Sequence, residues 1–95
     1  MPSRDMLADV CRRWRMNELA VFGSVARGTS RPDSDVDLLV SFQPGAPWSS
    51  LDLLDLREEL VGLFGRRVDL VEESALRNPY RKASILKDKT PIHVA

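Results

Sequence analysis

Two carboxylates stand two residues apart in Asp35-Val36-Asp37, at the start of the alternating segment 35–42. If this segment is a strand, both side chains leave from one face, roughly 6–7 Å apart at the backbone, and can converge on one ion. Unpaired carboxylates in such a place repel each other and tend to protonate unless a divalent cation keeps both charged. Mg²⁺ fits best, because it binds one or two carboxylates and completes its shell with water and substrate phosphates.

A turn suited to phosphate binding precedes the two aspartates. Gly23 follows a short apolar run, and Ser24 begins a segment that predicts one or two turns of helix closed by Gly28. Glycine lets a phosphate approach the backbone, and a serine at a helix N-terminus offers a hydroxyl and an N–H. A phosphate grip about ten residues before a metal-binding Asp-x-Asp predicts metal-assisted attack on a nucleoside triphosphate.

A small sheet is needed to position these groups. The pattern predicts strands over 19–22, 35–42, 67–71 and 92–94. In 35–42 the residues Val36, Leu38, Val40 and Phe42 face one way, and Asp35, Asp37, Leu39 and Ser41 face the other. Another carboxylate, Asp69, lies between apolar neighbours on the strand 67–71.

Helices are expected between these strands. An apolar stripe at helical spacing, Leu7, Val10, Cys11 and Trp14, predicts a first helix capped by Ser3, with Cys11 in the core. Ser49 and Asp52 form a capping box before a helix that runs to Phe64 and ends at Gly65. Asn78-Pro79 starts a helix to about Leu86. The order predicts a small α/β or α+β sheet with helices on one face.

Length and composition limit the function. The 95 residues predict a single domain, 1–95, and 14 basic residues balance 14 acidic ones, which argues against direct nucleic-acid binding. Residues 74–95 hold five basic residues against one acidic residue, so the acidic remainder, 1–73, is where cations would bind. A lone Cys11, no secretory signal pattern and no long apolar run predict a cytoplasmic protein without membrane contact.

The motifs carry a family resemblance. Gly23-Ser24, ten residues and then Asp35-Val36-Asp37 is similar to the signature of the polymerase-beta-like nucleotidyltransferase superfamily. Gly-Ser-x-Ala-Arg-Gly at 23–28 and Asp-Ser-Asp-x-Asp-Leu at 33–38 resemble its minimal nucleotidyltransferase (MNT) branch. The similarity extends over nearly the whole chain and implies a small mixed β-sheet flanked by helices.

The resemblance implies roles for individual residues. Asp35 and Asp37 would bind two Mg²⁺ ions, with Asp69 as the third metal-site carboxylate. Asp69 would also help to activate an acceptor hydroxyl for attack on the α-phosphate of ATP, with loss of pyrophosphate. Arg27 matches the motif, and contact with phosphate and a structural ion pair are both open for it. Outside the resemblance, Trp48 either stacks on a base or covers the core.

The resemblance also implies a partner. Minimal nucleotidyltransferases of this kind are typically encoded beside a small HEPN-type protein, and 78–86 is similar to the tail of that branch. The expected function is adenylylation of a hydroxyl, tyrosine first, on a HEPN-type RNase toxin, so that the chain acts as an antitoxin in a hetero-oligomer. Two alternatives stay open: a non-catalytic antitoxin that only binds, and a nucleotidyltransferase subunit acting on a small molecule or an RNA end. Intact Gly23-Ser24 and all three aspartates favour the enzyme.

Overall fold

A mixed sheet forms the centre of the molecule in the computed structural model, which describes residues 2–29 and 31–95. In this part of the chain the sheet has four strands in the order β3-β2-β1-β4. They are β1 (Met16–Phe22), β2 (Val36–Phe42), β3 (Val68–Glu72) and β4 (Thr90–Val94). β1 pairs antiparallel with β2 and β4, whereas β2 and β3 run parallel. The predicted mixed sheet is confirmed, with strand bounds shifted by up to three residues.

The helices begin at the predicted capping residues. They are α1 (Arg4–Arg13), α2 (Gly23–Arg27), α3 (Ser50–Phe64) and α4 (Pro79–Asp88), with a short 3-10 turn η1 (Glu73–Ala75). The Ser3 hydroxyl accepts a hydrogen bond from the Met6 N–H at 3.2 Å. Ser49 and Asp52 form the complete capping box, and the Asn78 side chain accepts from the first turn of α4. α3 is the crossover that a parallel β2–β3 pair requires.

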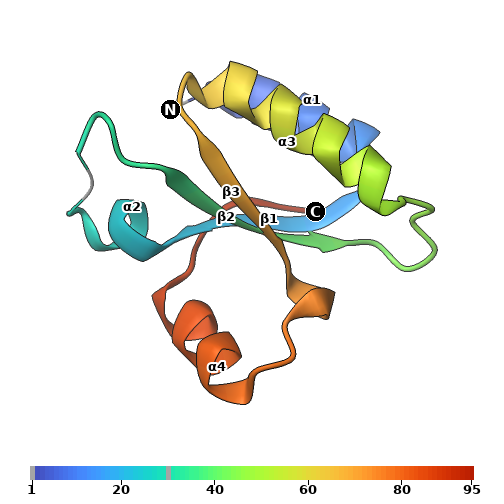
Figure 1. Cartoon of the computed structure of the whole chain (residues 1–95). Helices are drawn as coiled ribbons and strands as arrows, with labels where there is room; N and C mark the ends of the chain where they lie inside the picture. The colour runs from blue at the N-terminus through green and yellow to red at the C-terminus, as the bar shows by residue number, and fades with distance from the viewer. Residues whose placement is uncertain (1, 30) are drawn as a thin grey trace.

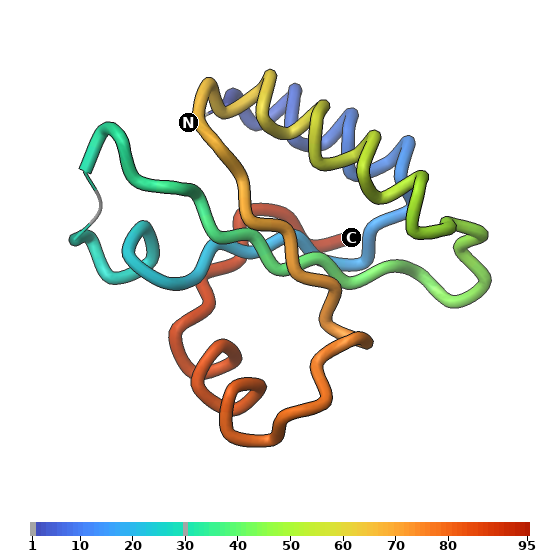
Figure 2. The backbone as a smooth tube through the Cα atoms, in the orientation of Figure 1, coloured from blue at the N-terminus to red at the C-terminus, as the bar shows by residue number. Residues whose placement is uncertain are grey.

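The two faces of the sheet have separate hydrophobic clusters. α1 and α3 run side by side on one face, and α4 covers the other (Figures 1 and 2). The larger cluster joins α1 and α3 to the sheet and includes the fully buried Leu56 and Leu60. The smaller one consists of Ala20, Phe22, Leu39, Val71 and Ile85, with Leu76 and Leu86 packed against it.

The prediction that helices cover one face only is wrong. The apolar side chain of Leu39 lies on the face opposite Leu38 and is 1% exposed, so that face also needs a cover. α4 supplies it through Ile85. A strand with apolar residues on both faces is characteristic of a sheet packed on both sides. Among the described residues, every helix is too short or too polar to cross a bilayer.

Cys11 lies in the core, as predicted. Its side chain is fully buried in the larger cluster, on the buried face of α1. Burial raises the pKa of the thiol to about 11, because the thiolate would lose its hydration. At neutral pH Cys11 is therefore a protonated, unreactive packing residue.

Candidate active site

Two aspartates meet where β2 and β3 begin. In the parallel register Asp37 lies opposite Asp69, and on its other side Asp37 lies opposite Phe22 at the end of β1. Val36 and Val68, one residue earlier on each strand, belong to the α1/α3 cluster. Because successive side chains alternate between faces, Asp37 and Asp69 project together from the α4 face.

Asp35 completes the group. It directly precedes β2, two residues from Asp37, and its carboxylate oxygen Oδ1 lies 3.0 Å from Nε of Arg67, the residue just before β3. The side chain of Arg67 is 80% exposed and that of Asp35 is 47% exposed. An ion pair in such contact with water contributes little stability, so a stronger cation can displace it.

The charges of Asp35 and Asp69 act on the carboxyl of Asp37. Burial raises the pKa of Asp37, and the negative charges of Asp69 and Asp35 raise it further, while Arg27 acts in the opposite direction. No three acidic, histidine or cysteine side chains among the described residues are already arranged as metal ligands. The group nevertheless suits a hard divalent cation, because such an ion binds carboxylate oxygens and removes their repulsion.

Two features of the structure favour glycine at position 23. Its backbone is left-handed, with φ of +66°, which side chains disfavour. A Cβ atom built at this position would run into the Asp37 carboxylate, with Cγ only 3.2 Å away. The turn into α2 therefore lies directly against the central aspartate. Ser24 follows it, and its carbonyl accepts a hydrogen bond from the Thr29 N–H at 2.9 Å, which closes the turn.

Arg27 forms an ion pair that joins α2 to α4. Its Nη1 atom lies 3.0 Å from Oδ2 of Asp88, the last residue of α4. The positive charge of Arg27 also acts on Asp37 and partly offsets the rise in the pKa of that carboxyl. The structure therefore shows the ion pair that is one of the two predictions for Arg27. The contact with a phosphate stays a prediction.

Arg66 has a role that the sequence did not reveal. Its Nε donates to the Ser34 carbonyl at 2.9 Å, and its Nη2 donates to the Arg31 carbonyl at 2.7 Å. The two bonds hold the loop that leads into Asp35. The basic pair at 66–67, directly before the strand with Asp69, was the only local signal, and it does not say which carbonyls a guanidinium will reach.

Trp48 packs on Trp14, which in turn packs against the larger hydrophobic cluster. Its Nε1 donates to the Trp14 carbonyl at 2.8 Å, and the two indole rings pack with centroids 4.8 Å apart. Trp48 lies near the C-terminal end of β2, beside Phe42, whereas the aspartates lie at its N-terminal end. Base stacking by Trp48 therefore has no place at the aspartate group.

Comparison with known proteins gives the family. The family model described as "Nucleotidyltransferase domain" matches residues 3–92. A Thermococcus cleftensis protein, protein adenylyltransferase MntA, is 46% identical over 70 residues, which cover 74% of this chain and 69% of the relative.

Solved structures agree with this result. A structure provisionally named a minimal nucleotidyltransferase is 42% identical, with a TM-score of 0.76, and the match covers 93% of this chain and 87% of that one. A Shewanella oneidensis complex of a tri-AMPylated HEPN toxin with its MNT antitoxin matches with a TM-score of 0.69 over 97% of this chain and 70% of that one. At 14% identity that second likeness concerns the fold alone. The chain belongs to the nucleotidyltransferase domain family, in its minimal nucleotidyltransferase branch.

Proposed function

We propose that this chain is an Mg²⁺-dependent protein adenylyltransferase that transfers AMP from ATP to a tyrosine hydroxyl of a HEPN-type RNase toxin and thereby acts as an antitoxin. The observation that carries the proposal is the placement of Asp35, Asp37 and Asp69 where β2 and β3 begin, with Asp37 against the turn at Gly23. The name of the Thermococcus cleftensis relative and the AMPylated toxin in the Shewanella oneidensis complex support the substrate and the partner.

Asp35, Asp37 and Asp69 would hold the metal, with two Mg²⁺ ions expected. When bound, Mg²⁺ neutralises the carboxylates and the triphosphate and makes the α-phosphate easier to attack. The raised pKa of Asp37 supports this assignment, because it indicates a partly buried charge that its protein neighbours do not balance.

The turn after β1 would hold the nucleotide phosphates. Gly23 brings bare backbone next to Asp37, and Ser24 adds a hydroxyl and an N–H at the start of α2. Hydrogen bonds to a charged phosphate are among the stronger ones in proteins, so these two residues would fix the triphosphate relative to the aspartates. Arg27 pairs with Asp88 through Nη1 alone, so its other guanidinium nitrogens are available to contact a phosphate.

The transfer step follows from this placement. The acceptor oxygen forms a bond to the α-phosphorus, the bond from that phosphorus to the β-phosphate oxygen breaks, and pyrophosphate leaves. The hydroxyl proton passes to a carboxylate, and the exposed Asp69 is the one best placed to take it. The described residues form one sheet with its covering helices, so we assign the acceptor to a second protein that approaches from the α4 face.

The experiment is incubation of this chain with ATP, Mg²⁺ and the HEPN-type protein encoded beside it, followed by mass spectrometry. We expect the partner to gain one or more adenylyl groups on a tyrosine. Asp69→Asn should reduce turnover by roughly a hundredfold or more while ATP binding changes little, because loss of a general base acts on the chemical step. Asp55→Asn, an exposed carboxylate of α3, is the matched control.

The result also separates the alternative functions. A partner inhibited equally by the wild type and by Asp69→Asn, without added mass, would make the chain a binding antitoxin. Transfer to RNA ends or to small molecules, with an unmodified HEPN protein, would assign it to the third class.

A further inference from the structure

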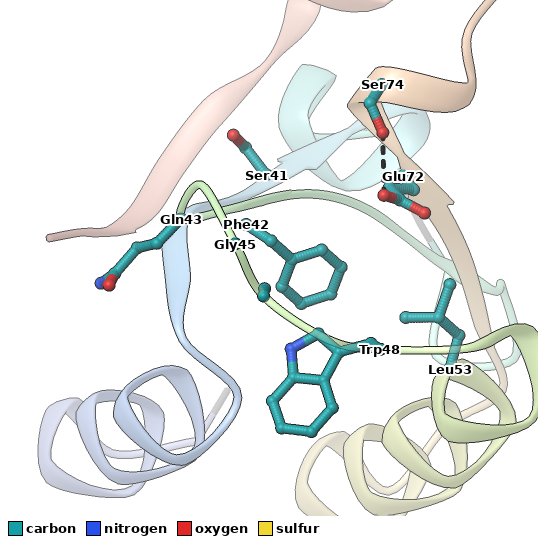
Figure 3. Close-up of a pocket in the computed structure, with 9 residues that line it drawn as sticks. Ser41, Phe42, Gln43, Gly45, Trp48, Leu53, Glu72 and Ser74 are labelled. Atoms are coloured by element: carbon teal, nitrogen blue, oxygen red, sulfur yellow. Dashed lines mark hydrogen bonds between the residues drawn. The ribbon is translucent and has the colours of Figure 1, made fainter.

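A hollow lies at the far end of the sheet from the aspartates. It has a volume of about 240 Å³ and forms where β2 and β3 finish, below the loop that leads into α3 (Figure 3). Two aromatic rings, Phe42 and Trp48, line it together with Glu72, Ser74 and Ser41, whose hydroxyl points away from the two rings (Figure 3). We call these five residues the aromatic–acidic pocket.

The carboxylate of this pocket has no cationic partner. Glu72 accepts a hydrogen bond from the Ser74 hydroxyl at 2.8 Å, but no lysine or arginine within 2–29 and 31–95 pairs with it. It is partly buried, so its charge is screened less than that of a fully exposed carboxylate. The pocket therefore attracts a positive group.

The aromatic rings favour the same kind of ligand. A cation near the face of a tryptophan or phenylalanine ring gains attraction from the ring's electron density. Trp48 is already fixed by its hydrogen bond to the Trp14 carbonyl and by packing on the Trp14 ring. A ligand would thus find the indole in place and would not have to order it.

Size and surroundings identify the source of the cation. The hollow is smaller than the roughly 300–1,000 Å³ typical of small-molecule sites, and it fits one side chain. A smaller hollow beside it shares Leu53 and Glu72 and is lined further by the apolar Leu54 and Leu70 and by Arg57. The Nε of Arg57 donates to the Val68 carbonyl at 3.0 Å. Leu54 is 55% exposed and Leu51, one turn earlier on α3, is 74% exposed. Arginine is enriched among the residues that anchor protein interfaces in pockets, and its guanidinium can both pair with a carboxylate and stack on an aromatic ring.

We propose that the aromatic–acidic pocket binds an arginine side chain of a protein partner, while apolar side chains of the same partner pack on Leu51 and Leu54. The pocket lies roughly 15 Å along β2 from Asp37, so it can be occupied while the aspartate group is at work. The proposal requires a protein partner but not nucleotide transfer.

The first test uses single amino-acid probes and needs no nucleotide. In an NMR titration, N-acetyl-arginine methylamide should shift the resonances of the Trp48 indole and of Ser41, whereas the norleucine analogue should not. Glu72→Gln should weaken arginine binding by roughly tenfold, because the charged hydrogen bond is lost. Glu58→Gln, another carboxylate change on the exposed side of α3, should leave it unchanged. Equal shifts from both probes, or equal arginine binding by Glu72→Gln and the wild type, would overturn the proposal.

The second test uses the complex. Binding of the HEPN-type protein is measured without ATP, and we expect Glu72→Lys to weaken it by roughly tenfold or more through charge repulsion. Asp5→Lys, the same charge reversal at an exposed position of α1, is the control and should bind normally. Unchanged binding by Glu72→Lys would also overturn the proposal. Failure of AMP transfer would contradict the proposed function and would leave this result intact.

Discussion

Two carboxylates, Glu59 on the α1/α3 side of the sheet and Asp37 on the α4 side, have opposite electrostatic surroundings. On the α1/α3 face, Glu59 accepts hydrogen bonds from Arg13 and from Trp14 Nε1, and the bond from Arg13 lowers the pKa of Glu59. On the α4 face, burial and the neighbouring charges of Asp69 and Asp35 raise the pKa of Asp37. Glu59 is paired with a cation, whereas Asp37 keeps a repulsion with its neighbouring carboxylates that a bound cation would relieve.

The hydrophobic packing differs in the same direction. The α1/α3 face holds the larger cluster, centred on fully buried side chains such as Leu56 and Leu60, whereas the α4 face has a smaller cluster around Leu39 and Ile85. A protein that keeps an unbalanced charge group on its less packed face gives up stability there. Such a loss is typical of functional sites, so the contrast supports the proposed site at the aspartates.

The largest effect should come from removing the charge of the central aspartate. Asp37→Asn should reduce AMP transfer by roughly a thousandfold or more, because a metal ligand is lost. The thermal midpoint of the metal-free protein should stay the same or rise, because repulsion with Asp69 is also lost. Transfer is measured with labelled ATP, and stability by thermal unfolding.

Asp35→Asn should behave in the same way, and Asp55→Asn should change neither quantity. A variant Asp37→Asn that unfolds much earlier than the wild type would show that the aspartate group is structural. The contrast between the two faces would then be broken.

The next effect concerns the stabilising face. Leu60→Ala removes a fully buried side chain from the α1/α3 cluster and should lower the free energy of unfolding by about 2–5 kcal/mol. The folded fraction should transfer AMP at the wild-type rate, because the aspartates lie on the other face. Urea unfolding and transfer assays corrected for the folded fraction measure the two. Leu54→Ala, on an exposed position of the same helix, should stay within about 0.5 kcal/mol of the wild type.

Substitutions at two glycines distinguish the effect of backbone strain from the effect of displacing the Asp37 carboxylate. Gly23→Ala and Gly28→Ala both place a side chain at positive φ, of +66° and +72°, which costs about 1–2 kcal/mol each. Only at Gly23 does the new Cβ meet a neighbour, the Asp37 carboxylate, which must move aside. The two variants should therefore lose similar stability, but Gly23→Ala should lose far more transfer activity. Equal activity in both would mean that the position of the Asp37 carboxylate does not matter.

Local signals predicted most of the fold and the motif residues. Helix starts depend on a capping residue and its near neighbours, so Ser3, Ser49 and Asn78 were identifiable from the sequence. That Asp69 lies opposite Asp37 depends on the pairing of two strands about thirty residues apart, and only the family resemblance implied that the two carboxylates share a site.

The missed features all depend on tertiary contacts. The second covered face depends on Ile85 of α4 packing against Leu39 of β2. The hydrogen bonds of Arg66 join segments more than thirty residues apart in the sequence. The aromatic–acidic pocket combines the end of β2 with residues beyond β3. Composition and periodicity do not predict which distant residues come into contact.

The smallest effect is in the pH dependence of stability. Because the pKa of Asp37 is raised above its ordinary value of 3.8 in the folded protein, the folded state holds this proton to a higher pH than the unfolded chain does. The contribution of Asp37 to the free energy of unfolding therefore falls as pH rises from the unfolded pKa through the raised folded pKa. Asp37→Asn has no such dependence. The free energy of unfolding of Asp37→Asn minus that of the wild type should thus be near zero below about pH 3.8 and should grow to a plateau at neutral pH.

Urea unfolding of both proteins without metal, from acid to neutral pH, measures this difference, and Asp55→Asn is the control. A difference that does not change with pH would show that Asp37 carries no unrelieved charge, and the contrast between the faces would have to be explained by packing alone.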